Sequence, residues 1–398
     1  MTRGKTPNAP LLPQVTVETI TSVEGVEALR ADYEHLCGVT DNKLPFALHE
    51  WHSTWCRHFL GCDPQVRDEP LFYLLRNAAG QCVAIAPFIL SRRRFGPLKI
   101  VSISLLGPDP FITEIRAPMI ERGYEHLTAR AVRDGLARIR DWDWVHWSGV
   151  SDEFADALNT GGALRWEPSP AGFVLDLPSS WEELRLRLKR NIRESLRHCY
   201  NSLKRDGHRF EFQVIEDPAG IQQSLDRYLA LHTMRANAPH RVIHPDRFAS
   251  GACREFLYAI CDRLAARGAV RLFALKIAAH VVAMRLGFVV GDSLYLYYSG
   301  YDPLWARYSV MTTTVAEALK YAIAHGFKTV NLSPGREVSK MRWGPRQVDY
   351  GSTYEANTRL RSRLARSAYV TARSETGIQS RVLKLITPKD LQQRLKSL

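Results

Sequence analysis

One pattern of secondary structure occurs twice along the 398-residue chain. In each half, apolar periodicity predicts a β-hairpin, then a strand, a helix and a further strand, in the same order. A chain with two copies of such a unit can bury one face of each sheet beneath a helix of the same copy. The pattern therefore predicts an α/β (α+β) protein with two related tandem domains, each a mixed sheet flanked by helices. The length agrees with about 100–200 residues per domain.

The repeat depends on alternating apolar residues in the strands and on apolar residues three and four apart in the helices. In the first half, the expected hairpin, strand, helix and strand are Leu71–Leu75 with Val83–Leu90, Lys99–Leu106, Leu127–Ile139 and Trp142–Trp147. In the second half they are Val270–Ile277 with Val281–Val290, Leu294–Ser299, 311–325 and Lys328–Leu332. The two halves are similar in pattern rather than residue by residue.

We expect domains at 15–178 and 179–350, followed by a basic helical tail at 351–398. A basic helix, Trp181–Arg205, is expected to open the second domain. Its charges predict either a solvated face or a site for a coenzyme 3′-phosphate or an anionic acceptor. Nucleic acid is disfavoured because the aromatic residues do not interleave with the basic ones. The tail is expected to pack on the body or to dock on an anionic membrane surface.

Charge and cysteine content narrow the classes of function. Lys and Arg number 54 against 41 Asp and Glu, for a formal net charge of +13. This excess favours anionic ligands, such as acidic lipid, nucleic acid or coenzyme A, without choosing among them. Seven scattered cysteines without a Cys-x-x-Cys pair are evidence against a disulfide framework and a structural zinc site. No apolar run is long enough for a membrane span, and the N-terminus lacks the apolar core of a secretory signal. We therefore expect a cytoplasmic protein without a metal.

The segment after the third strand of the second half predicts an anion site. Strand Leu294–Ser299 leads into a polar loop and then into helix 311–325. The first backbone N–H groups of a helix have no partner within the helix, and the helix dipole adds partial positive charge there. Ser309 is a candidate N-cap and Arg307 a candidate phosphate ligand. The alternative is an ordinary connection between a strand and a helix. Neither a Walker motif nor a Gly-x-Gly-x-x-Gly motif is present.

The same region resembles a known family. The runs LYLYYSGYDPLWARYSVMTTTVAEALKYAIAHGF and VNLSPGREVSKMRWG resemble the GNAT-like acetyltransferases of the CelD-like branch, which is associated with cellulose biosynthesis. That branch is similar to the Fem-type aminoacyl transferases. Three further segments agree with the resemblance: LPFALHEWHSTWCRHF, RLKRNIRESLRHCYNSLKRDG and YLALHTMRAN. The resemblance covers roughly residues 45 to 345.

The resemblance implies two tandem GNAT folds, of which the second holds an acyl-CoA donor. It implies a donor groove along Tyr298 to Arg307 and a pyrophosphate contact through the backbone N–H groups of Ser309 to Met311. The implied cofactor-binding residues are Tyr301, Arg307, Ser309, Val310, Met311 and Lys340. The chain departs from the family at Val310 and Met311, where relatives often carry Gly, and at Ser339, where a Tyr is common.

Transfer from a thioester to an amine needs a base for the ammonium proton and an acid or hydrogen-bond donor at the thioester. The candidates for the base are Glu337, His232 and Asp302, and Tyr298 or Tyr301 is the candidate acid. Each candidate base has a simpler interpretation. Glu337 fits a solvated loop acid, His232 a satisfied core histidine, and Asp302 a turn cap.

Two further residues are candidates for binding the substrate. Arg235 lies three residues after His232 on one helical face, so the pair can hold an anionic group of the substrate. Trp343 stands in the aromatic–Gly pair that ends the family motif. Lys340 and Arg342 fit either phosphate ligands or surface charges.

These observations lead to three hypotheses. The first is an acyltransferase that moves an acyl group, first of all acetyl, from acyl-CoA to an amine or hydroxyl of a saccharide or cell-envelope precursor. The second is a Fem-type aminoacyl transferase, which would use charged tRNA; tRNA is otherwise disfavoured as a partner, and DNA is not expected. The third is a non-catalytic scaffold in polysaccharide biosynthesis. Peripheral contact with the inner membrane or with the polysaccharide-synthesis machinery stays open.

Overall fold

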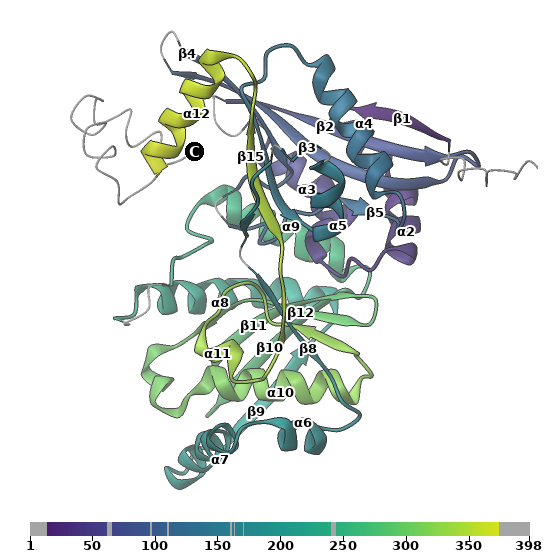
Figure 1. The fold of residues 1–398 in the computed structure, drawn as a ribbon. Coiled ribbons are helices and arrows are strands. Elements are labelled where there is room, and N and C mark those ends of the chain that lie inside the picture. The colour runs from purple at the N-terminus through teal and green to yellow at the C-terminus, as the bar shows by residue number, and fades with distance from the viewer. Residues whose placement is uncertain are drawn as a thin grey trace, which may run out of the picture.

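The computed structural model describes residues 14–373, apart from short gaps at 62–65, 96–97, 110, 160, 163, 170 and 240–243. The part of the predicted tail beyond residue 373 lies outside the described residues. The described chain forms two sheets, one above the other in Figure 1. No helix among the described residues is long and apolar enough to cross a membrane.

The first sheet has the strand order β1-β2-β3-β4-β6-β15-β7, with β5 paired to β3. Its strands are β1 (Val15–Ile20), β2 (Val66–Asn77), β3 (Cys82–Phe95), β4 (Leu98–Leu105), β5 (Met119–Ile120), β6 (Trp144–Val150), β7 (Glu167–Pro168) and β15 (Gly351–Ala356). The helices of this half are α1 (Val23–Glu27), α2 (Arg30–Val39), η1 (Pro45–Ala47), α3 (His49–Phe59), α4 (Glu125–Arg138) and α5 (Asp152–Leu158). Only β4 and β6 pair in parallel among these described strands.

The second sheet has the order β14-β8-β13-β12-β11-β10-β9. Its strands are β8 (Gly172–Asp176), β9 (Phe210–Ile215), β10 (Val270–Ile277), β11 (His280–Val290), β12 (Ser293–Tyr301), β13 (Thr329–Asn331) and β14 (Arg346–Val348). The helices are α6 (Trp181–Arg187), α7 (Arg190–Arg205), α8 (Pro218–Asn237), α9 (Gly251–Ala265), η2 (Pro303–Tyr308), α10 (Val310–Ala324) and α11 (Val338–Met341), followed by α12 (Leu360–Arg373). Apolar residues of α8 and α9 pack on one face of this sheet, and those of α10 on the other.

The repeated pattern appears in the structure as one topology used twice. In the first sheet, β2, β3 and β4 are antiparallel neighbours, and the chain passes through α4 to β6, which is parallel to β4. In the second sheet, β10, β11 and β12 are antiparallel neighbours, and α10 leads to β13, which is parallel to β12. The expected fold class of two mixed sheets flanked by helices is therefore confirmed.

The limits of the sheets differ from the expected domain boundaries. Strand β8 falls within the range 15–178, yet it pairs with β13 and β14 of the second sheet. Strand β15 falls within the expected tail, yet it pairs with β6 and β7 of the first sheet. In Figure 1, β15 runs from the lower half back along the upper sheet. Local periodicity identifies a strand but carries no information about its partner, which explains the difference.

The expected basic helix 181–205 is two helices. Ser180 caps α6, where its side chain accepts a hydrogen bond from the Glu183 N–H. The chain then leaves the helical conformation at Leu188, which has extended backbone angles and a buried side chain. Helix α7 begins at Arg190. Burial of Leu188 is a tertiary effect, and the distribution of charges along the sequence gave no sign of it.

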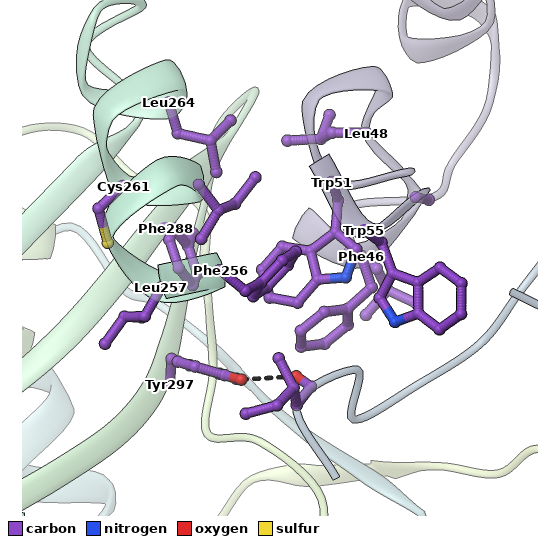
Figure 2. Close-up of a cluster of buried hydrophobic side chains, with 14 of the residues drawn as sticks. Phe46, Leu48, Trp51, Trp55, Phe256, Leu257, Cys261, Leu264, Phe288 and Tyr297 are labelled. Carbon is purple, nitrogen blue, oxygen red and sulfur yellow. Dashed lines mark hydrogen bonds between the residues drawn. The ribbon is translucent and has the colours of Figure 1, made fainter. Parts of the chain in front are cut away.

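One hydrophobic cluster contains buried residues of both halves. The ring of Trp51, on α3, lies 5.1 Å from Phe256 of α9 and 4.7 Å from Phe46, measured between ring centroids. Figure 2 shows these side chains interleaved with Phe288 and Tyr297 of the second sheet. Trp51 is fully buried. The aromatic stripe of α3 therefore belongs to the core, in agreement with its usual role at this spacing.

Gly300 sets the distance between β12 and α8. A Cβ atom at this position would lie 2.2 Å from the backbone nitrogen of His232 and 2.3 Å from the backbone carbon of Leu231. Backbone atoms of a packed helix cannot yield as a flexible side chain does. We therefore expect Gly300→Ala to destabilise the fold by about 1–3 kcal/mol, the usual cost of overpacking.

Urea denaturation measures this effect. Gly38→Ala, in the last turn of α2, is the matched control because a Cβ atom there meets nothing within 4 Å. Alanine is favoured over glycine in a helix by about 0.5–1 kcal/mol, so this control should be slightly stabilising. Equal effects of the two substitutions would contradict the close approach of β12 and α8.

Candidate active site

The candidate site lies where two parallel strands separate. Strands β12 and β13 pair through 293–295 and 329–331. The next residue after β13, Leu332, no longer pairs with β12 and donates its N–H to the Phe173 carbonyl of β8. A cavity of about 370 Å³ lies here, lined by residues of α8, β11, β12, α10, α11 and the segment after β13. In sheets with parallel strands, ligands bind beyond the carboxyl ends of strands that diverge.

The first domain closes one side of this cavity with the loop that precedes β5. A bulge in the pairing of β11 with β12 allows two consecutive tyrosines to reach this loop, although successive side chains of a regular strand point to opposite faces. Tyr297 donates its hydroxyl to the Ile112 carbonyl at 2.5 Å, and Tyr298 donates to the Phe111 carbonyl at 2.6 Å. Burial raises the pKa of Tyr298. The hydroxyl of Tyr298, the predicted acid, is thus engaged with the backbone of the other domain.

The same loop brings a carboxyl group into the cavity. The two oxygens of Glu114 accept hydrogen bonds at 2.7 Å, one from the Ser333 hydroxyl and one from the Tyr295 hydroxyl. Burial raises the pKa of Glu114, and the two hydrogen bonds oppose that rise. A carboxylate at the wall of a cavity becomes a stronger proton acceptor when burial raises its pKa.

Cationic side chains dominate the rest of the wall: Arg235, Arg247, Arg285, Lys340 and Arg342. Glu114 and Glu337 are the two carboxylates of the cavity lining. Three of the guanidinium groups, those of Arg235, Arg285 and Arg342, have a buried Nε without a hydrogen-bond partner. A buried N–H without a partner is costly, and more so on a charged group. The lining is therefore suited to an anionic ligand that would accept these hydrogen bonds.

His232 lines the cavity, but both of its ring nitrogens are engaged. The backbone N–H of Arg247 donates to Nε2 at 3.2 Å, so Nε2 is an acceptor. Nδ1 lies 3.1 Å from the Ser299 carbonyl and must donate to it. Burial lowers the pKa of His232, which favours this neutral form. The geometry corresponds to the satisfied core histidine, and neither nitrogen is free to serve as the predicted base.

Glu337 and Lys340 form an ion pair at the cavity wall. The Lys340 Nζ lies 2.9 Å from a Glu337 carboxylate oxygen and also donates to the Pro334 carbonyl. Burial lowers the pKa of Lys340, whereas the Glu337 carboxylate opposes this effect. The Glu337 side chain is 47% exposed, as expected for a solvated loop acid. Trp343 is buried and lines the same cavity.

The middle of the predicted donor segment, residues 300–310, does not line the cavity. Asp302 accepts a hydrogen bond from the Leu304 N–H and caps η2, so it has the role of a turn cap. Arg307 lies over the Tyr308 ring at 4.7 Å and donates to its hydroxyl at 2.7 Å. Neither Asp302 nor Arg307 lines the cavity. Both predictions assumed that the loop points its side chains at the ligand. In the structure, Asp302 instead caps η2 and Arg307 instead stacks on Tyr308.

Of the predicted cofactor-binding residues around the start of α10, some line the cavity and others do not. Ser309 occupies the N-cap position in a left-handed conformation, with φ of 52°, and its side chain makes no capping hydrogen bond. Val310 is buried in a cluster with Tyr308, and Tyr301 packs against that cluster. None of Tyr301, Ser309 and Val310 lines the cavity, but Met311 does. Backbone contact of α10 with a donor pyrophosphate stays a prediction.

Glu114 and Arg285 were missed by the sequence reasoning. Arg285 carried a usable signal, because it is a lone charged residue within the apolar run VVAMRLGFVV, and a buried charge needs a partner. Glu114 carried none, because it lies in a loop of the other domain and resembles any surface acid in the sequence.

Comparison with known proteins agrees with this geometry. Residues 190–341 match the family model described as Acetyltransferase (GNAT) domain. The crystal structure of FemX is similar with a TM-score of 0.57 and 12% identity, covering 87% of this chain and 99% of that one. A conserved protein of unknown function from Bacteroides thetaiotaomicron VPI-5482 is similar with a TM-score of 0.50 and 14% identity, covering 82% and 97%. No curated protein matches the sequence.

These findings define the class of the second domain. Residues 190–341 form a GNAT-type acetyltransferase domain, which supports the expected GNAT-type acyltransferase. The cavity described above is bounded mainly by residues of this domain. The likeness to FemX extends over both halves of the chain and concerns the fold.

Proposed function

We propose that the protein transfers an acyl group, first of all acetyl, from acyl-CoA to an amine or hydroxyl of a saccharide or cell-envelope precursor. The observation that carries the proposal is the cavity at the split between β12 and β13, with three buried guanidinium groups that lack a partner at Nε. Anionic groups of the bound substrates, the phosphates of a coenzyme A thioester among them, would supply the missing acceptors. The saccharide or envelope acceptor follows from the resemblance to the CelD-like branch.

In the proposed mechanism, the acceptor nucleophile attacks the thioester carbonyl, the new C–N or C–O bond forms, and the C–S bond breaks. Glu114 takes the proton that the nucleophile loses, because its carboxyl is held at the cavity wall and its pKa is raised. Lys340 returns a proton to the departing thiolate, since burial makes its ammonium group more acidic than usual. Tyr298 positions the loop that carries Glu114.

The donor is expected to contact Arg342. This guanidinium donates to the Thr312 hydroxyl of α10 at 2.9 Å and to the Ser195 hydroxyl of α7 at 3.0 Å, which fixes it beside the start of α10. Its buried Nε has no partner. Arg342 therefore offers a fixed, partly satisfied cation where a helix N-terminus also favours a phosphate.

Removal of this cation tests the donor site. We expect Arg342→Met to weaken binding of acetyl-CoA by about tenfold or more, because a hydrogen bond to a charged group contributes about 1.5–3 kcal/mol. Isothermal titration and the thermal midpoint with acetyl-CoA, longer acyl-CoAs and free coenzyme A measure the loss. Donor at about 100 times its dissociation constant should stabilise the wild type by about 2.7 kcal/mol.

Arg307→Met is the informative comparison, because the sequence favours Arg307 as the phosphate ligand whereas the cavity favours Arg342. A larger loss in Arg307→Met would return the donor to the loop 301–309. If no coenzyme A species binds the wild type, the proposed function is wrong.

A second candidate is Fem-type aminoacyl transfer from charged tRNA. The observation that favours it is a second cavity, of about 640 Å³, between α6, α7 and α10. Its basic lining comprises Arg185, Arg190, Arg193, Arg197 and Lys320. A groove of this charge suits a polyanion. Tight tRNA binding whose affinity falls steeply with salt would support this candidate. Turnover with acyl-CoA alone would exclude both the aminoacyl transferase and the non-catalytic scaffold.

A further inference from the structure

Two arginines of the cavity meet at one serine. Arg285, on β11, stands directly opposite Ser299 of β12 in the antiparallel pairing. Side chains of such a pair have their Cβ atoms about 4.5–5.5 Å apart. Arg235, on α8, donates to the Ser299 hydroxyl at 2.8 Å. Burial, and after it the positive charge of Arg235, lowers the pKa of Arg285 to about 10.

The carboxylates of the cavity do not neutralise this pair by direct contact. Glu114 accepts its two hydrogen bonds from Ser333 and Tyr295. Glu337 forms its ion pair with Lys340. The partners of Arg235 and Arg285 are neutral: Arg235 binds Ser299 and the His244 ring, and Arg285 binds the Leu296 carbonyl at 3.0 Å.

Each of the two guanidinium groups also has a buried Nε–H that nothing accepts. Guanidinium groups bind carboxylates and phosphates through pairs of parallel hydrogen bonds, so an open Nε on a fixed arginine is suited to such a group. Two like charges held together without a counterion are unfavourable, and an anion between them would remove both the repulsion and the missing hydrogen bonds.

We propose that Arg235 and Arg285 form an anion subsite that binds a carboxylate or phosphate group of the acceptor, so that the acceptor is an anionic molecule and not a neutral sugar. The assignment to the acceptor rests on the proposed function. The Arg285 charge acts on Glu114, the proposed proton acceptor, and the nucleophile of the acceptor must reach Glu114. Arg342, in contrast, is tied to α10 and α7, where the donor is expected.

The first measurement is the thermal midpoint of the full chain with inorganic phosphate or succinate at constant ionic strength, in the presence of saturating free coenzyme A. Coenzyme A occupies the donor site, so any further rise in the midpoint reports a separate anion subsite. We expect a saturable rise in the wild type and in Arg130→Met, an exposed arginine of α4 outside the cavity. In Arg235→Met and Arg285→Met this rise should disappear.

The outcomes separate the subsite from the proposed function. An anion effect that coenzyme A abolishes would assign the two arginines to the donor and overturn the proposal, as would the absence of any anion effect. An anion effect that depends on Arg285 in a protein that binds no coenzyme A would leave the subsite standing and remove the acyl-CoA transferase.

The stability of each variant without ligand shows whether a loss of anion binding is only the result of a loss of folding. Arg285→Met removes a buried cation that no carboxylate contacts. The desolvation cost of that charge is removed with it, so we expect the variant to fold. A structural arginine would instead leave a strongly destabilised protein. Arg285→Lys keeps the charge but loses the planar fork, so we expect it to bind phosphate about tenfold more weakly than the wild type while folding normally.

Turnover with acetyl-CoA completes the test with a matched pair of acceptors, glucosamine 6-phosphate and glucosamine. We expect the wild type to prefer the phosphorylated amine by at least tenfold in kcat/KM. The preference should vanish in Arg285→Met, chiefly through a higher KM for the phosphorylated amine. Equal use of both acceptors by the wild type, with an unchanged profile in the variant, would overturn the proposal.

Discussion

Substitution Glu114→Gln is expected to lower kcat for acyl transfer by at least 100-fold while changing the KM for the donor little. A positioned general base typically contributes about 10²–10⁴ in rate. The amide keeps the size of the carboxyl group, and its oxygen can still accept one of the hydrogen bonds from Ser333 and Tyr295. The loss should therefore come from the missing base and not from a collapsed cavity. Steady-state kinetics with acetyl-CoA and an accepted amine measure it.

The pH dependence gives a second readout for the same residue. Because the folded pKa of Glu114 is raised above its unfolded value, the folded protein binds this proton more tightly. The contribution of this group to stability is thus present at low pH and falls as the pH rises from the unfolded toward the folded pKa. Glu114→Gln should therefore gain stability relative to the wild type above this window, and kcat of the wild type should rise with pH through the folded pKa.

Glu355→Gln is the matched control for Glu114→Gln. Glu355, on β15 of the first sheet, is also partly buried. It pairs with Arg133 at 2.8 Å and accepts a hydrogen bond from the Trp147 indole of β6. It does not line the cavity. Glu355→Gln should lower stability but leave kcat intact. An active Glu114→Gln variant would exclude Glu114 as the base and make Glu337 the next candidate.

The second large effect is expected from Trp51→Ala. Trp51 is fully buried between the halves of the protein, with Phe256 and Phe288 on one side and Phe46 on the other. Removal of a buried aromatic side chain costs about 3–5 kcal/mol. The Trp51 indole also donates to the Thr113 hydroxyl at 3.1 Å, so the variant should loosen the loop that carries Glu114 and lose activity as well.

Urea denaturation followed by circular dichroism and fluorescence measures this loss. Because the core is shared, both probes should report one transition that moves to lower urea in Trp51→Ala. Val17→Ala, at a strand position that is 49% exposed, should change stability by no more than about 0.5 kcal/mol. Two separate transitions, of which only one moves, would show that the halves fold independently and contradict the shared core.

The sequence placed several residues at the site, but it did not show what they do there. The residues that were expected at the site and that line the cavity are His232, Arg235, Tyr298, Met311, Glu337, Lys340 and Trp343. Their functional roles could not be read in the same way. The His232 ring is occupied by the Ser299 carbonyl and the Arg247 N–H, and only the packing of α8 against β12 brings these groups together.

The sequence by itself determined the repeated hairpin, strand, helix and strand of each half, and with them the fold class of two mixed sheets flanked by helices. These properties depend on periodicity along a few neighbouring residues, which each segment carries on its own. The tertiary structure decided the rest. It placed β8 and β15 in their sheets, left Asp302 and Arg307 outside the cavity, and brought Glu114 of the first domain into the same cavity as Arg285. Those features depend on which surfaces meet when the whole chain packs, and residues that meet in this way lie far apart in the sequence.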